Sequence, residues 1–164
     1  MREITINGVT YQIKFSYRAA KYKKCVEEVF ALLSGAVLMG DATDTAEPKF
    51  SDLIKGSCKQ VAMIPSLCDT MFFAGLIEDK NESKPKTEEE AGDLLISYME
   101  ENEKTYNDIY NSLMECMGED GFFEKSGITQ MLESMFDKEN KENPAPEKVT
   151  PMEKKTTKKK TSTK

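Results

Sequence analysis

The sequence contains no histidine, and this absence removes several kinds of chemistry at once. Histidine is the commonest general base and the usual partner of a serine or cysteine nucleophile. The four cysteines show no C-x-x-C spacing, so a zinc site of the usual Cys/His kind is not expected. Glycine patterns typical of phosphate-binding or dinucleotide-binding loops are also missing. The sequence therefore predicts a protein without catalytic residues, metal or cofactor.

Long apolar runs are missing as well. No run approaches the roughly 20 residues that a membrane-spanning helix needs, and residues 2–15 do not resemble a signal peptide. Each cysteine falls in a helical pattern, where a reduced thiol behaves as a small apolar side chain. We expect a soluble cytoplasmic protein that does not contact a membrane.

Charge is distributed unevenly along the chain. Residues 78–143 carry 19 acidic and 7 basic side chains, whereas residues 144–164 carry 2 acidic and 7 basic ones. An acidic body disfavours specific binding to nucleic acid. From about residue 139 the chain is polar and rich in Pro and Lys, which is typical of disorder. The predicted division is a folded domain over residues 1–138 and a disordered tail over residues 139–164. The basic tail is either a solubilising or processed end, or makes a weak electrostatic contact with acidic protein or nucleic acid.

The stretch "ITINGVTYQIKF" is typical of a β-hairpin. Asn7-Gly8 suits a two-residue type I′ turn because both residues tolerate positive φ. This turn sets the register, which pairs Ile6 with Val9 and Ile4 with Tyr11 on one apolar face. An isolated hairpin is marginal in water, so this face must pack on helices of the same chain or on another subunit.

The rest of the folded part has helical periodicity, so the predicted fold class is α+β, mostly α, with a hairpin followed by a bundle of about five helices. Ser16 is the expected N-cap of a helix over residues 17–34, with Gly35 at its C-terminal end. A long loop over residues 35–50 follows. The last helix carries its apolar stripe over residues 128–136 and stops before "KENKENPAP".

Two further helical segments flank Pro65, which is expected to end or kink the first of them, over residues 51–64. Its predicted inward residues are Leu53, Ile54, Cys58, Val61 and Ala62. Apolar residues nearly encircle the second segment, "SLCDTMFFAGLIED". This segment is either central to the fold or pressed between the core and a partner.

Thr87 and Glu90 form a predicted capping box that opens a helical region over residues 88–117. The apolar stripe is interrupted near residue 102 without Gly or Pro, so one long helix and two shorter ones both fit the pattern. Gly118 is expected to end this region. A turn, "EDGFFEKSG", carries two adjacent phenylalanines, of which one is a buried anchor or a docking knob.

The remaining features concern contact between proteins. Seven of the ten methionines fall in the helical body, where methionine either fills a core or forms an adaptable apolar surface. Apolar patterning alone selects the candidate partner-binding residues, which are Ile4, Tyr11, Met71, Phe72, Phe73, Tyr98, Met99, Tyr110, Met114, Phe122 and Phe123.

The succession of motifs resembles the phage tail assembly chaperones. "REITINGVTYQIKFSYRAAKY" is similar to the opening of that family, in which an x-x-I-N-G-x-x-Y hairpin leads into a Lys/Glu-rich helix. "MFFAGLIED", "TEEEAGDLLISYMEEN" and "MGEDGFF" follow in the family's order, so the resemblance covers about residues 2–136. The specificity lies in this succession, because each motif is degenerate.

The resemblance implies a small, acidic, mostly helical protein of the host bacterial cytoplasm. Such chaperones bind the tape measure protein, recruit tail tube subunits and are absent from the finished virion, and many also have a longer, frameshifted form. The family has no catalytic residues to carry over. Self-association through the hairpin is a further expectation. A small structural or adaptor protein retained in the particle, and a regulatory protein with a cellular target, are the alternatives.

Overall fold

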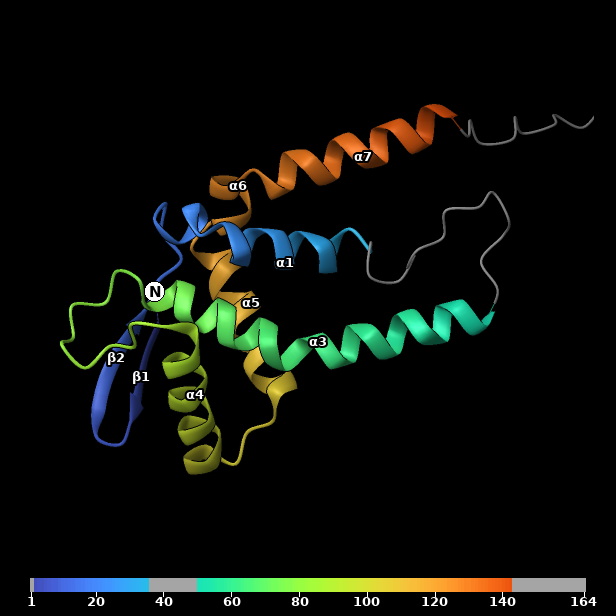
Figure 1. Ribbon diagram of the computed structural model, residues 1–164. Helices are drawn as coiled ribbons and strands as arrows, with labels where there is room; N and C mark the ends of the chain where they lie inside the picture. The colour runs from blue at the N-terminus through green and yellow to red at the C-terminus, as the bar shows by residue number, and fades with distance from the viewer. Residues whose placement is uncertain (1, 36–49, 143–164) are drawn as a thin grey trace, which may run out of the picture.

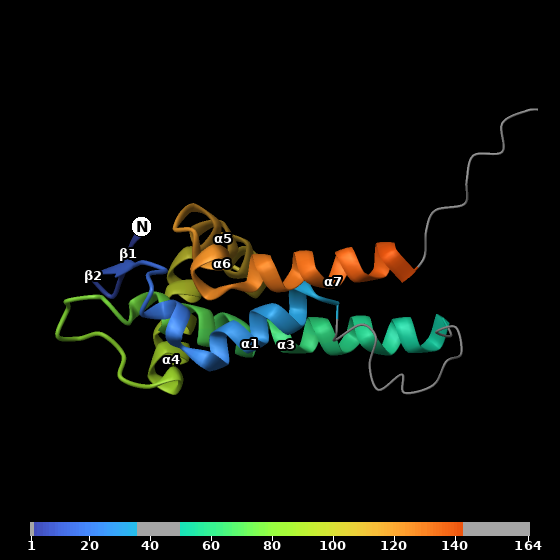
Figure 2. The same ribbon diagram turned by 90° about the horizontal axis from the view of Figure 1, so that it is seen from above.

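An antiparallel hairpin followed by helices makes up the computed structural model, which describes residues 2–35 and 50–142 (Figure 1). The hairpin lies at one end of the molecule. The first half of helix α3 (Phe50–Leu76) and helix α7 (Ile128–Glu142) extend toward the other end, as the view from above also shows (Figure 2). The predicted mostly helical α+β class is confirmed. Predictions for residues 36–49 and for the tail beyond residue 142 lie outside the described residues.

The hairpin has the predicted turn and register. Strands β1 (Arg2–Ile6) and β2 (Val9–Ile13) pair Ile6 with Val9 and Ile4 with Tyr11. Both turn residues have positive φ, 49° at Asn7 and 76° at Gly8, as a type I′ turn requires. Ile6 and Tyr11 are buried in the core of the same chain. The apolar face therefore packs on this chain's own helices.

Helix α1 begins later than predicted. A short 3-10 helix (Ala19–Lys21) comes first, and α1 spans Lys23–Leu33. Ser16 does not cap α1, because its Oγ accepts a hydrogen bond from the N–H of Arg18 at 3.1 Å. The predicted C-terminal role of Gly35 agrees with its positive φ of 71°.

Helix α3 is a single helix that runs through Pro65, so the two predicted segments are continuous. The helix packs against α1, α4, α5 and β2, and its second half is the buried part. Its buried side chains include Leu67, Met71 and Phe72. Close packing reaches the hairpin at Gly75, whose carbonyl accepts from the N–H of Lys14 at 2.9 Å. Central burial is thus the outcome for this segment.

The region over residues 88–117, predicted to be either one long helix or two shorter ones, contains two helices. They are α4 (Glu88–Asn102) and α5 (Tyr106–Glu119). Glu103 adopts the left-handed conformation between them, and Thr105 opens α5 with a capping box that the sequence analysis missed. Thr87 caps α4 as predicted, but Glu90 accepts from the N–H of Lys86 rather than from that of Thr87.

The chain after α5 also differs from expectation. Helix α5 continues through Gly118, and the left-handed residue that follows it is Gly121. The predicted turn contains a short helix, α6 (Phe122–Ser126). Helix α7 then continues to Glu142, beyond the position where its apolar stripe ends. Favourable local helix formation in "KENKE" extends the helix without requiring burial.

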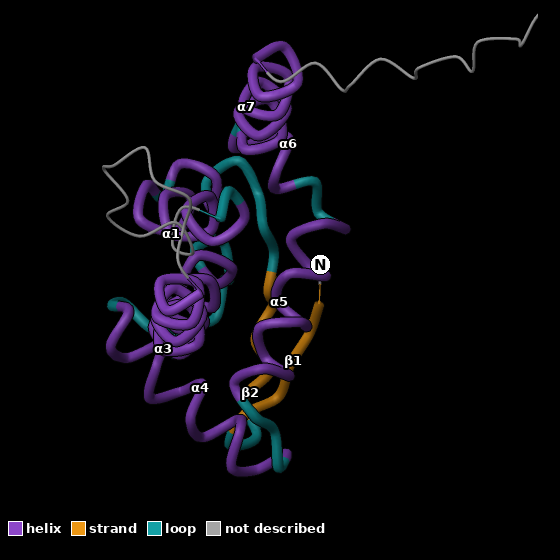
Figure 3. The backbone as a smooth tube through the Cα atoms, turned by 90° about the vertical axis from the view of Figure 1, so that its right-hand side faces the viewer, coloured by secondary structure: helices purple, strands orange, loops and turns teal. Residues whose placement is uncertain are grey.

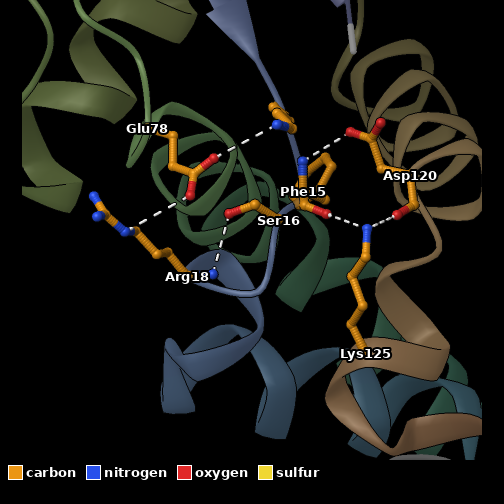
Figure 4. A network of polar contacts seen from close by, with 7 residues as sticks. Phe15, Ser16, Arg18, Glu78, Asp120 and Lys125 are labelled. Atoms are coloured by element: carbon orange, nitrogen blue, oxygen red, sulfur yellow. Dashed lines mark hydrogen bonds and ion pairs between the residues drawn. The ribbon is translucent and has the colours of Figure 1, made fainter.

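Polar contacts join the end of the hairpin to distant elements (Figure 4). The N–H of Phe15 donates to Asp120 Oδ2 at 2.8 Å. Lys125 Nζ donates to the carbonyls of Phe15 and Asp120. On the other side, Arg18 pairs with Glu78, with 3.7 Å between Nε and Oε1. These contacts hold the exit of β2 against α3, α5 and α6.

Candidate partner-binding surface

Exposed apolar side chains gather on α1, α3 and α7, away from the hairpin. We call the five large ones the arm residues, and they are Leu33, Ile54, Val61, Met131 and Met135. Viewed end-on, α7, α1 and α3 lie in a row (Figure 3). Each of these three neighbouring helices therefore carries at least one exposed large apolar side chain.

The stripe on α3 was predicted to face inward, and this prediction is wrong. Ile54 is 49% exposed and Val61 is 67% exposed. Cys58 and Ala62 are also exposed, while the side chain of Leu53 lies outside those described. Positions 54, 58 and 61 share one helix face, so the predicted periodicity is present. Periodicity identifies which residues share a face, but it does not supply an element to cover that face.

Helix α7 has a similar surface. Ile128 is buried and Leu132 is partly buried, so one side of the helix anchors it to the body. Met131 and Met135, one turn apart, are 56% and 44% exposed. Methionine adapts to differently shaped apolar partners because its side chain is unbranched and flexible. The α7 surface is thus suited to contact another helix.

All of the predicted partner-binding residues are buried in the core of the folded chain or packed against it. Tyr11, Met71, Phe72 and Phe122 are buried. Seven others are partly buried against the core, namely Ile4, Phe73, Tyr98, Met99, Tyr110, Met114 and Phe123. Only part of each of these seven side chains is accessible, so the arm residues are the more exposed apolar surface.

Three of those candidates meet around one hollow between the hairpin and the helices. Ile4 of β1, Phe72 of α3 and Tyr98 of α4 come together there. The full lining is Arg2, Ile4, Ile13, Phe72, Leu95, Tyr98, Ile109, Ser112, Leu113 and Cys116. Arg2, one of the lining residues, donates to Ser112 and pairs with Glu115 at 2.7 Å. The hollow is largely apolar.

A polar cluster links α1, α3 and α4. Tyr22 and Lys24 both donate to the carboxylate of Glu88. Burial acts to raise the Glu88 pKa, but these two hydrogen bonds outweigh it and lower the pKa. Asp69 differs, since its buried Oδ1 has no hydrogen-bond partner among the described residues. Burial and the neighbouring Glu88 raise the Asp69 pKa.

The cysteines Cys25 and Cys68 are buried in the core. Burial raises the pKa of the Cys25 and Cys68 thiols to about 12, so both are protonated at neutral pH. Within the described ranges, no three His, Cys, Asp or Glu side chains are grouped to hold a metal ion. None of the described helices is both long and apolar enough to cross a bilayer.

Comparison of the chain with protein-family models, with curated proteins and with solved structures finds no match.

The exposed apolar stripes of α3 and α7 define the candidate partner-binding surface. Sequence reasoning missed their exposure because a stripe that will stay uncovered has the same period as one that will be buried.

Proposed function

We propose that this chain is a phage tail assembly chaperone that works in the host bacterial cytoplasm. It binds apolar faces of the tape measure protein, recruits tail tube subunits during tail morphogenesis, and leaves before the virion is complete. The order of motifs along the chain supports this assignment. The structural observation that carries it is the uncovered apolar stripe over Ile54, Cys58 and Val61 of α3.

Recognition of this kind needs an apolar surface on a folded support. The second half of α3 provides the support, because Leu67, Met71 and Phe72 anchor it in the core. The first half carries the stripe outward, and α7, which bears the exposed Met131 and Met135, extends toward the same end of the molecule (Figures 1 and 2). An amphipathic helix binds such a surface through apolar residues at positions i, i+3 or i+4, and i+7.

The acidic body fits a temporary role. Its excess of acidic side chains over residues 78–143 keeps an unassembled complex soluble and disfavours nonspecific association. A partner held by a few exposed side chains binds with moderate affinity, since only part of the buried apolar area is converted to binding free energy. Moderate affinity allows the chaperone to dissociate when tube subunits assemble.

Co-purification with a tape measure fragment tests the proposal. We expect association at micromolar concentrations. Val61→Glu should weaken the association about tenfold or more, because it replaces an apolar contact with a charge that binding would bury; a tenfold loss corresponds to about 1.4 kcal/mol. Ile96→Glu is the matched control, since Ile96 is a helical, 44% exposed residue on α4, away from the arm residues. No association of the unmodified chain, or equal effects of both substitutions, would count against the proposal.

Mass spectrometry of purified virions separates the chaperone from the structural adaptor. A chaperone leaves before the particle is finished, so its peptides should be missing from virions that contain tube and tape measure proteins. Stoichiometric recovery of this chain from virions would replace the proposal with the adaptor role.

A further inference from the structure

The two edges of the hairpin differ in how their backbone groups are satisfied. In the observed register, the N–H and C=O groups of Thr10 and Gln12 point away from β1. Side chains of the loop after α3 close this edge. The N–H of Gln12 donates to Asp79 Oδ2 at 3.2 Å, and Asn81 Nδ2 donates to the carbonyl of Thr10 at 3.2 Å. The β2 edge is thus unavailable for a further strand.

The β1 edge is open over Glu3 and Thr5, whereas at the turn the N–H of Asn7 donates to Glu101 Oε1 of α4 at 3.1 Å. The same register directs the backbone N–H and C=O groups of Glu3 and Thr5 away from β2, and they have no hydrogen-bond partner among the described residues. Figure 3 shows β1 at the margin of the molecule. Strand β1 also lacks the proline, lysine or bulge that commonly protects an edge. Its one carboxylate, that of Glu3, accepts from Gln12 Nε2 at 3.2 Å and so is drawn toward β2.

We propose that a second copy of this chain pairs its own β1 with this edge, antiparallel, about a two-fold axis at Ile4. The two hairpins then form one four-stranded sheet. This inference does not depend on the proposed function, because it rests on the edges of the hairpin alone.

The register follows from the groups that point outward. The axis at Ile4 places Glu3 of each copy opposite Thr5 of the other, and each such pair exchanges two backbone hydrogen bonds. Ile4 then faces Ile4 of the second copy, and the partly exposed parts of both side chains become covered. A register that placed the two Glu3 residues directly opposite would bring like charges together.

A second copy suits this edge better than an unrelated strand for two reasons. The pattern over Glu3, Ile4 and Thr5 is complementary to itself under two-fold symmetry, which is the commonest symmetry of protein dimers. The hairpin also lies at the opposite end of the molecule from the first half of α3 and the end of α7 (Figure 1). Pairing through β1 therefore leaves the arm residues of both copies exposed.

Sedimentation of the full chain from micromolar to millimolar concentrations tests the proposal, with two proline variants. Thr5→Pro blocks the open edge, whereas Thr10→Pro, at the directly paired position, is the matched control on the closed edge. Both substitutions remove the contact between the Thr5 and Thr10 hydroxyls. We expect a monomer–dimer equilibrium for the unmodified chain and for Thr10→Pro, and dimerisation at least tenfold weaker for Thr5→Pro. A monomeric unmodified chain, or equal effects of both prolines, would overturn the proposal.

A cross-linking measurement covers the case in which a proline variant does not fold. In a Cys58→Ser background, which removes the exposed thiol, Ile4→Cys should form a disulfide-linked dimer with oxidised glutathione as oxidant, because the two-fold axis places the two thiols opposite each other. Thr10→Cys in the same background should remain unlinked. Linkage of neither or of both contradicts the proposed register. The Thr5→Pro chain should still bind a tape measure fragment, so failure of this proposal is distinguishable from failure of the proposed function.

Discussion

The N–H of Phe15 and the carboxylate of Asp120 are joined by a 2.8 Å hydrogen bond across 105 positions of the sequence. Phe15 is fully buried, and its ring packs edge-on against Phe122, 5.6 Å away. The bond therefore connects the exit of the hairpin to the C-terminal end of α5 beside an aromatic contact. Asp120→Ala should cost about 1–3 kcal/mol in the free energy of unfolding, since the buried N–H of Phe15 loses its acceptor.

Urea unfolding followed by circular dichroism measures this loss, and Asp120→Asn is the control because an amide oxygen can still accept the bond. The Asn variant should retain more stability than the Ala variant. Equal stability of the unmodified chain and Asp120→Ala would show that the contact contributes nothing.

Two glycines in helices should respond oppositely to alanine. A Cβ on Gly75 would lie 2.7 Å from Cγ2 of Ile13 and 3.4 Å from the ring of Phe15, both buried in the core. Gly75→Ala should therefore destabilise the fold by about 1–3 kcal/mol. A Cβ on Gly118 would meet nothing within 4 Å, so Gly118→Ala should stabilise the fold by about 0.5–1 kcal/mol through backbone entropy. Thermal unfolding of both variants measures the two signs. No loss of stability in Gly75→Ala would contradict the close packing at α3, and destabilisation by Gly118→Ala would contradict the open space at that position of α5.

Glu88 and Asp69 should have opposite effects on the pH dependence of stability. The folded state lowers the Glu88 pKa, so the stability contributed by its ionised form is present above its unfolded pKa and is lost as pH falls through its folded pKa. Glu88→Gln should cost on the order of 1 kcal/mol near neutral pH, with the difference from the unmodified chain disappearing in acid.

For Asp69 the folded state raises the pKa, so ionisation opposes folding at all pH values above the folded pKa. Asp69→Asn should stabilise the fold by roughly 1 kcal/mol near neutral pH, and this gain should shrink as the unmodified Asp69 becomes protonated. Unfolding free energies measured between neutral pH and mild acid test both variants. Parallel pH profiles for the two would contradict the opposite environments of these carboxylates.

Pro65 lies where the exposed first half of α3 meets its buried second half. Proline has no N–H to donate to the carbonyl of Val61, and its ring crowds that carbonyl. Pro65→Ala should stabilise the first half by about 1–3 kcal/mol, because proline costs about 3 kcal/mol in a helix interior. Amide hydrogen exchange over residues 54–64 should slow in the variant, while exchange in α5 should not change. Unchanged exchange in α3 would show that the helix is already fully stable there.

Local interactions account for the parts that the sequence predicted well. Asn7-Gly8 alone sets the hairpin turn and hence its register, and Thr87 alone supplies the cap of α4. The exact helix ends were less predictable. The sequence placed a cap at Ser16, whose side chain instead bonds the N–H of Arg18, and an end at Gly118, which the helix passes through. Several residues near a helix end can each serve as its cap, and tertiary contacts determine which of them does.

The order of amino acids is sufficient to tell which residues share a face, since periodicity follows from the geometry of a strand or helix. Which of these faces are covered depends on how the helices and the hairpin pack together. Met71 and Val61 both belong to apolar patterns of the same helix, yet Met71 is buried and Val61 is 67% exposed. A helix face is buried only when another helix or strand packs against it, and the position of that element depends on the packing of the whole chain. The difference between the two hairpin edges also depends on tertiary packing. The side chains of Asp79 and Asn81 bond β2 because α3 returns the chain to the hairpin, and they do not reach β1.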